Sequence, residues 1–311
     1  MTDITRLFCL PVAEAIHKVL RSCGDKLQEV RLRAGKPLAV TVGGRSYFVS
    51  PGGDLLHTHQ GALRVDWDMI VKSLEFMSRS SLYAFENEMR NGYITVEGGH
   101  RIGMVGRAIC QKGQVTGINP IAGINVRIAH EIRGCAEKLL PYVTDGGFLL
   151  HTLIVSPPGG GKTTMLRDLI RLASDRLGMS VGVVDERSEI GGCYRGVPQC
   201  EVGMQTDVLD GCPKADGMLM LLRTMNPQVI AVDELGGRAE LEAVESVLHA
   251  GVKLLCTAHS NSLSELEKRP GFDKLVQFGV FERIVVLGGQ KGPGTIAQVY
   301  GFNEDGRYAL A

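Results

Sequence analysis

The sequence contains no long uninterrupted run of apolar residues. No stretch approaches the roughly 20 consecutive apolar residues that a membrane-spanning helix needs. The N-terminal segment has an early Asp3, a short apolar stretch and no small-residue cleavage site, which is atypical of a secretion signal. We therefore expect a cytoplasmic protein without direct membrane insertion, whose association with a membrane would depend on partner proteins.

A surplus of charge is missing as well, because 34 Lys and Arg residues balance 34 Asp and Glu residues. A protein that mainly grips nucleic acid usually carries a basic surplus or a basic face. Aromatic residues make up only 5% of the chain, which leaves few side chains on which single-stranded bases could stack. Both observations argue against nucleic acid as a partner, although a balanced chain can still carry a local basic patch.

The eight cysteines include no Cys-x-x-Cys pair. Structural zinc sites usually contain such close pairs, and no histidine stands at ligand spacing from a cysteine. Cys193, Cys200 and Cys212 share one glycine-rich stretch. Their wide spacing favours separate reduced thiols over a zinc site.

The length of 311 residues favours two domains. The first, which we place at residues 1–140, has short strands between glycines together with helical patterns, and this mixture predicts a small α+β domain. Its predicted helices cover residues 4–22, 66–79 and 81–91, and its predicted strands cover residues 29–33, 37–42, 45–49, 93–96, 101–105 and 123–127.

The second domain, which we place at residues 141–311, has a different sequence pattern. Apolar strands alternate with amphipathic helices, which is typical of a parallel sheet with helices on both faces. We expect strands at residues 149–155, 181–184, 229–232, 253–257, 283–287 and 296–300, the last two in a hairpin, and helices at residues 163–177, 215–225, 239–250 and 263–278, the last one broken at Pro270 and Gly271.

The strongest signal for chemistry is Ser156-Pro-Pro-Gly-Gly-Gly-Lys-Thr-Thr164, which lies between a predicted strand and a predicted helix. Glycines let backbone N–H groups converge on phosphate oxygens, and the dipole of the following helix favours negative charge. Ser156 stands where the phosphate-loop motif usually has its first glycine. The motif predicts an α/β fold: a RecA-like P-loop NTPase domain that binds ATP, with the smaller α+β domain before it. The predicted nucleotide contacts are Pro157, Pro158, Gly159, Gly160, Gly161, Lys162, Thr163 and Thr164, with Lys162 on the β- and γ-phosphates and Thr163 on Mg²⁺.

A second apolar strand ends in two carboxylates, Asp233 and Glu234. Asp233 is predicted to hold Mg²⁺ together with Thr163. Glu234 is predicted to be the general base that orients and polarises the attacking water. Two solvated acids at the tip of a buried strand would be the simpler interpretation, but the phosphate loop earlier in the chain favours the catalytic one.

Two more strand ends carry polar residues. Thr257 and His259 follow a predicted strand, so they should lie at the carboxyl edge of the sheet, where ligands bind in such folds. Either could sense the γ-phosphate, and His259 is our catalytic candidate, with a purely structural histidine as an equal alternative. Asp185 and Glu186 could join the metal or water network, or simply form a solvated loop.

An arginine from an adjacent subunit can stabilise the charge of a transferring phosphoryl group. Arg223 precedes the strand that ends in Asp233, and Arg238 follows it. Arg187 could also serve a neighbouring subunit. We take Arg223 as the candidate, although the sequence alone does not choose between Arg223 and Arg238.

The order of these motifs resembles the secretion and type IV pilus ATPases. Over nearly its whole length the chain is similar to the stage III sporulation protein AA family. The residue strings that carry this resemblance are Glu29-Val-Arg-Leu-Arg33, Arg90-Asn-Gly-Tyr93, Gly98-Gly-His-Arg101, Val184-Asp-Glu-Arg-Ser-Glu189, Thr206-Asp-Val-Leu-Asp210, Cys212-Pro-Lys-Ala215 and Thr257-Ala-His259.

The resemblance implies an ATPase in the mother cell of endospore-forming bacteria, held peripherally at the inner membrane by membrane proteins of the stage III sporulation channel. It also implies a homo-oligomer, in the form of a hexameric ring, that uses ATP and Mg²⁺ and energises or assembles the channel. In the family pattern, Lys162 and Thr163 match nucleotide-binding positions, and Asp233 and Glu234 match the magnesium and catalytic pair. Two alternatives stay open: a RecA-like nucleic-acid translocase or helicase, and a nucleotide-dependent assembly module with negligible turnover.

Overall fold

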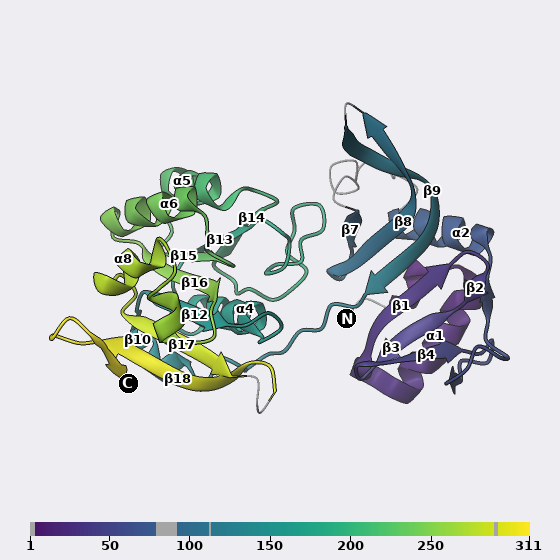
Figure 1. The fold of residues 1–311 in the computed structure, drawn as a ribbon, viewed down its shortest axis with the longest axis horizontal. Helices are drawn as coiled ribbons and strands as arrows, with labels where there is room; N and C mark the ends of the chain where they lie inside the picture. Colours follow the sequence, from purple (N-terminus) through teal and green to yellow (C-terminus); the bar gives the residue numbers. More distant parts are fainter. Residues whose placement is uncertain (1–3, 79–91, 112, 289–291) are drawn as a thin grey trace. The chain divides into compact units, whose positions relative to one another are not determined.

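The computed structural model describes residues 4–78, 92–111, 113–288 and 292–311. It divides the chain into two compact units, Met1–His130 and Glu131–Ala311 (Figure 1). The expected helix at residues 81–91 and the first two residues of the string Arg90–Tyr93 lie outside the described residues. Among the described residues, no helix combines the length and the apolar character needed to cross a membrane.

The first unit is built on an antiparallel sheet with the strand order β5-β4-β3-β1-β9-β8-β7. Apolar residues that alternate along the strands, such as Val30 and Leu32 of β1, are fully buried. Helices α1 and α2 contact β1. The elements are η1 (Ile4–Leu7), α1 (Leu10–Cys23), η2 (Gly24–Lys26), β1 (Leu27–Arg33), β2 (Lys36–Pro37), β3 (Ala39–Val42), β4 (Arg45–Val49), β5 (Leu55–Leu56), β6 (Arg64–Val65), α2 (Trp67–Ser78), β7 (Tyr93–Val96), β8 (His100–Gln111) and β9 (Gln114–Arg127).

Local sequence explains where α1 and α2 begin. The expected helix over residues 4–22 is a 3₁₀ turn followed by α1, because Pro11 is tolerated only in the first turn of a helix. Asp66 caps α2, since its Oδ1 accepts the N–H of Met69 at 2.8 Å.

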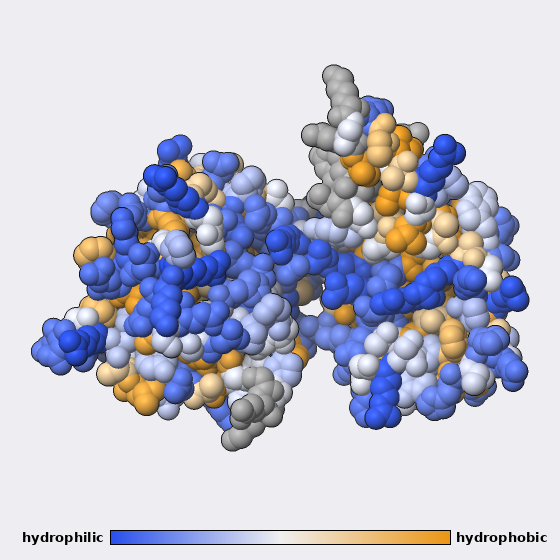
Figure 2. Space-filling view, in the orientation of Figure 1, coloured by the Kyte–Doolittle hydropathy of each residue, from blue (hydrophilic) through white to orange (hydrophobic). Residues whose placement is uncertain are grey.

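Strands β8 and β9 are much longer than the sequence pattern predicts. Their distal halves form a two-stranded ribbon that extends beyond the other strands (Figure 1). Val105, Ile109 and Val115 on this ribbon are 62%, 42% and 45% exposed, and Figure 2 shows apolar surface over it. Because the ribbon buries neither face fully, its sequence lacks the strict alternation that marks a half-buried strand.

The second unit is built on a sheet with the order β14-β13-β15-β16-β12-β17-β18-β19. The strands from β14 to β17 run parallel, and β18 and β19 add antiparallel edges. The strands are β10 (Thr144–Asp145), β11 (Phe148–Leu149), β12 (Thr152–Ser156), β13 (Val181–Asp185), β14 (Thr206–Asp210), β15 (Val229–Val232), β16 (Lys253–His259), β17 (Arg283–Gly288), β18 (Thr295–Phe302) and β19 (Tyr308–Leu310). The helices are η4 (Leu140–Tyr142), α4 (Lys162–Asp175), α5 (Lys214–Thr224), α6 (Arg238–His249), α7 (Leu263–Leu266) and α8 (Phe272–Gln277).

Successive residues of β12 belong to two different cores. Ile154 packs in a cluster with the apolar face of α4, while Leu153 and Val155 pack in a second cluster with α5, α6, α7 and α8. Helices therefore cover both faces of the sheet, as the sequence pattern predicts. The break expected between α7 and α8 is present at Gly271, whose φ is 91°.

The second unit begins at Glu131 rather than near residue 141. Ala136 and Leu139 are fully buried in the core beside α4. The N–H of Ala136 also donates to Asp168 of α4 at 2.8 Å. This segment forms turns instead of a periodic element, which is why the sequence alone does not assign it to the second unit.

Candidate active site

The phosphate loop connects β12 to α4 as the motif predicts. Gly159 and Gly161 have φ angles of 74° and 88°, which favour glycine. A Cβ on Gly160 would lie 2.3 Å from Oγ of the buried Ser156. Ser156, the departure from the motif, thus fills the space directly beneath Gly160 and closes the base of the loop.

Lys162 is the first residue of α4 and is buried. Its Nζ donates to the carbonyl oxygen of Ser156 at 3.2 Å and contacts Nδ1 of His259 at 3.1 Å. Burial lowers the pKa of the Lys162 ammonium, while the carboxylates of Asp233 and Glu234 act in the opposite direction. An ammonium group only donates hydrogen bonds, so Nδ1 of His259 is the acceptor and Nε2 carries the proton.

That proton placement joins His259 to Glu234. His259 Nε2 donates to Glu234 Oε1 at 2.9 Å, and Arg187 Nη1 donates to Glu234 Oε2 at 3.1 Å. The ends of β15 and β16 are therefore linked to the phosphate loop, because His259 contacts both Lys162 and Glu234. Arg187, one of the arginines that could have served a neighbouring subunit, contacts Glu234 of its own chain.

Thr163 and Asp233 also lie together. Thr163 Oγ1 donates to Asp233 Oδ2 at 2.6 Å, and Thr257 Oγ1 donates to Asp233 Oδ1. The parallel pairing of β16 with both β12 and β15 brings these three strand ends to one edge of the sheet. A hydroxyl and a carboxylate side by side are the hard oxygen ligands that Mg²⁺ prefers, so this pair fits the predicted metal.

Lys214 is a residue of the site that the sequence did not single out by itself. Its Nζ donates to the carbonyl oxygen of Glu234 at 2.8 Å and lies 3.4 Å from Glu186 and 3.7 Å from Glu240. The only signal for it was its place in the string Cys212–Ala215. Glu186 is thus held by an ion pair with Lys214 rather than left in a solvated loop.

Asp185 does not face this site as a free ligand. Its two oxygens accept the backbone N–H groups of Glu189, Ile190 and Gly191 at 2.8, 3.0 and 2.8 Å. Burial raises the pKa of the Asp185 carboxyl, and those three N–H groups oppose the rise. Asp185 therefore anchors the loop after β13.

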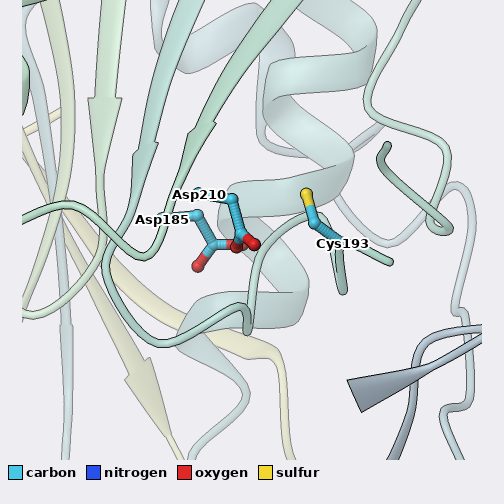
Figure 3. Close-up of side chains that lie close together, drawn as sticks. All are labelled: Asp185, Cys193 and Asp210. Atoms are coloured by element: carbon cyan, nitrogen blue, oxygen red, sulfur yellow. The ribbon is translucent and has the colours of Figure 1, made fainter. Parts of the chain in front are cut away.

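The same carboxylate lies near Cys193 and Asp210 (Figure 3), and in the described part of the chain no other group of three His, Cys, Asp or Glu side chains has the proximity of metal ligands. Ser188 Oγ donates to Asp210, and burial raises the pKa of the Cys193 thiol to about 12. Only one of the three cysteines of the glycine-rich stretch belongs to this group, in keeping with the expectation of separate thiols.

Of the two candidate finger arginines, Arg223 lies away from these residues. Arg223 is exposed near the end of α5, which leads into the start of β15, whereas Asp233 follows the end of β15. Arg223 therefore lies at the opposite edge of the sheet from the phosphate loop. Arg238 begins α6, is 94% exposed and pairs with Glu242 at 3.1 Å.

Comparison with known proteins shows that the sequence matches a known family. The family model described as "Sporulation stage III, protein AA" matches residues 2–307. Stage III sporulation protein AA of Bacillus subtilis (strain 168) is 40% identical over 304 residues, which cover 96% of this chain and 95% of that protein. Protein SEEDLING PLASTID DEVELOPMENT 1 of Arabidopsis thaliana is 27% identical over 270 residues, which cover 86% of this chain and 35% of that protein.

Solved structures share the fold. The ATPase DotB of Yersinia pseudotuberculosis matches with a TM-score of 0.60 at 14% identity, covering 96% of this chain and 81% of that one. The pilus retraction motor PilT with bound ADP matches with a TM-score of 0.58 at 18% identity, covering 95% and 80%. These similarities confirm the expected RecA-like P-loop fold, and the family match confirms the resemblance seen in the sequence.

Proposed function

This chain belongs to the stage III sporulation protein AA family, and we propose that it is a Mg²⁺-dependent ATPase that acts as a secretion-type motor of endospore formation. The observation that carries the proposal is the convergence of Lys162, His259 and Glu234 beside the Thr163–Asp233 pair. A phosphate loop, two oxygen ligands and a carboxylate in contact are what hydrolysis of a nucleoside triphosphate requires.

In this proposal the backbone N–H groups of the phosphate loop and Thr164 hold the phosphates, and Pro157 and Pro158 shape the start of the loop. Lys162 turns its ammonium toward the β- and γ-phosphates. Thr163 and Asp233 would hold Mg²⁺, which neutralises charge that develops on the phosphate oxygens. Thr257 fixes the orientation of Asp233 through its hydroxyl.

Glu234 is the proposed general base that orients and polarises the attacking water. His259 positions the Glu234 carboxylate and at the same time contacts Lys162. A nucleotide that draws Lys162 toward its phosphates would take the ammonium away from Nδ1 of His259. We propose that His259 in this way senses the γ-phosphate and passes its presence to Glu234.

The cellular role follows from the family rather than from the site. We propose a homo-oligomeric, hexameric ring in the mother-cell cytoplasm, held at the inner membrane by membrane proteins of the stage III sporulation channel, which it energises or assembles. The names of the relatives support sporulation, and the names of the structural neighbours, an ATPase and a pilus retraction motor, support motor activity.

A nucleic-acid translocase is the second candidate, and one observation favours it. Along β1, Arg31 and Arg33 lie on the same sheet face as Arg127 and Arg101, because Glu29 pairs with Arg127 and Arg127 pairs with Arg101. The carboxylate of Glu29 lies on the same face and partly offsets these four positive charges; its Oε2 lies 2.6 Å from Nη2 of Arg31. A basic sheet face in a neutral chain is what phosphate backbones would recognise.

One experiment separates the candidates. ATP turnover of the purified protein with Mg²⁺ is measured with and without DNA, for the wild type, Glu234→Gln and Lys162→Ala. We expect Glu234→Gln to bind ATP and lose about 100-fold or more in turnover, and Lys162→Ala to lose ATP binding while it stays folded. Equal turnover in the wild type and Glu234→Gln would reject the motor in favour of an assembly module, and strong stimulation by DNA would favour the translocase.

A further inference from the structure

The connection between β17 and β18 reaches the phosphate loop. The N–H of Gly294 donates to the carbonyl oxygen of Gly160 at 2.8 Å. A Cβ on Gly161 would lie 2.6 Å from the nitrogen and 3.0 Å from the Cα of Gly294. This approach of two backbones is possible only because Gly161 has no side chain.

The neighbouring strands support the described end of this connection, Gly292–Gly294. β17 pairs in parallel with β12, the strand that leads into the phosphate loop, and β18 closes against β17 with Gly288 opposite Thr295. Thr295 Oγ1 donates to the carbonyl oxygen of Gly292 at 2.9 Å. Gly294 is thus tied to the central sheet by the same neighbour strand that supports β12.

Because the peptide bond is planar, the hydrogen bond from Gly294 to Gly160 also affects how the loop binds phosphate. The carbonyl of Gly160 and the N–H of Gly161 belong to one trans peptide group, so they point in opposite directions. When Gly294 fixes the carbonyl of Gly160, the N–H of Gly161 is fixed toward the opposite face of the loop. A preset donor binds an anion more tightly than one that must first turn.

We propose that Gly294 is a positioning residue for the phosphates of the nucleotide: through the carbonyl of Gly160 it orients the N–H of Gly161 toward them. This inference rests on the proposed function. It assigns to the β17–β18 connection a part in nucleotide affinity that the phosphate-loop motif does not contain.

The test uses two substitutions at Gly294. This residue has φ 77° and no heavy atom within 4 Å of an added Cβ, so a new side chain acts through the backbone alone. Valine strongly disfavours that φ and should rotate the N–H away, whereas asparagine tolerates it and should keep the hydrogen bond. Gly306→Val is the matched control, because Gly306 has φ 73°, equal free space and a place in the neighbouring β18–β19 turn.

We expect Gly294→Val to raise the Kd for ATP about 10-fold or more, with Gly294→Asn close to the wild type and Gly306→Val unchanged. Hydrogen exchange without nucleotide should speed up in residues 159–163 of Gly294→Val but not in the control. Equal affinities of Gly294→Val and Gly306→Val for ATP, with a wild type that binds it, would overturn the inference alone. A wild type that binds no nucleotide would overturn the proposed function and the inference together.

Discussion

Glu234 adopts a φ of 53°, in a region that residues other than glycine rarely occupy. Its surroundings fix this conformation: its N–H donates to Thr257 Oγ1 at 2.8 Å, and its carbonyl accepts from Lys214 at 2.8 Å. Strained residues of this kind cluster at functional sites. The backbone of Glu234 therefore supports, independently of its side chain, the interpretation of this strand end as the catalytic one.

His100 allows a prediction about pH at the scale of one residue. It is buried at the start of β8, where its Nδ1 accepts the N–H of Ala129 at 3.1 Å, and among the described residues its Nε2 has no partner. Burial, followed by the nearby charge of His130, lowers the pKa of His100 from 6.5 to about 4. Between these two values the unfolded chain binds more protons, so the contribution of His100 to stability is complete above pH 6.5 and is lost as the pH falls toward 4.

The expected loss between pH 7.5 and 5 is about 2 kcal/mol in the free energy of unfolding. Urea unfolding at the two pH values, followed by the fluorescence of Trp67, the single tryptophan, reports on the first unit. His100→Asn keeps an acceptor for Ala129 and removes the titration, so it should show a correspondingly smaller loss. If both proteins lost the same free energy, His100 would not be the titrating group.

Several site residues could be found in the sequence because each belongs to the phosphate-loop motif or stands at the end of a strand. Lys162, Asp233 and His259 were predicted in this way, and the structure brings them to one edge of the sheet. Lys214 and Gly294 were not found. The Lys214 side chain contacts Glu234, which is distant in the sequence, and Gly294 contacts Gly160 through its backbone N–H. No local pattern reports which distant carbonyl an amine or an N–H will reach.

At the scale of the element, helix α4 connects the phosphate loop to the segment that opens the second unit. Asp168 is buried on α4 and accepts from the N–H of Ala136 and from Arg171, whose Nη2 lies 2.7 Å from its Oδ1. Burial alone would raise the pKa of Asp168, but the hydrogen bonds from Ala136 and Arg171 outweigh it and lower the pKa below its usual value. The helix that begins at Lys162 is thereby pinned to the segment that opens the second unit.

Asp168→Ala should lower the free energy of unfolding by about 3 kcal/mol, because it leaves Arg171 and the N–H of Ala136 without their buried acceptor. Glu137→Ala is the matched control from the same segment. Glu137 pairs with Arg176 at 2.6 Å, but both side chains are about half exposed, so its loss should cost about 0.5 kcal/mol. Chemical unfolding at neutral pH measures both, and equal losses would contradict a buried anchor at Asp168.

The elements that the sequence did not predict have weak apolar patterns, because they are exposed, only partly buried or irregular. β14 reads Thr-Asp-Val-Leu-Asp and is an edge strand that is only partly buried, so its apolar signal is short. The distal halves of β8 and β9 are exposed, and the turns at residues 131–139 have no period at all. By contrast, β12, β13 and β15 are buried throughout and were predicted to within a few residues.

At the scale of the whole molecule, the position of Arg223 limits how it could act. It lies at the edge of the sheet opposite the phosphate loop, so it cannot serve the site of its own chain. In a ring, heterologous contacts bring different surfaces of successive subunits together. An arginine on the far edge of one subunit could therefore complete the site of the next.

This arrangement predicts complementation between two inactive proteins. Arg223→Ala should lose about 1,000-fold in ATP turnover, as expected for a finger arginine, while it keeps its affinity for ATP. When Arg223→Ala is coexpressed with Glu234→Gln, about a quarter of the interfaces in a random ring pair an intact Glu234 with an intact Arg223. ATP turnover of the mixed assembly should then recover to about a quarter of the wild-type value. Arg238→Ala in place of Arg223→Ala is the control, since recovery confined to that pair would assign the finger to Arg238, and no recovery in either mixture would mean that neither arginine acts across a subunit interface.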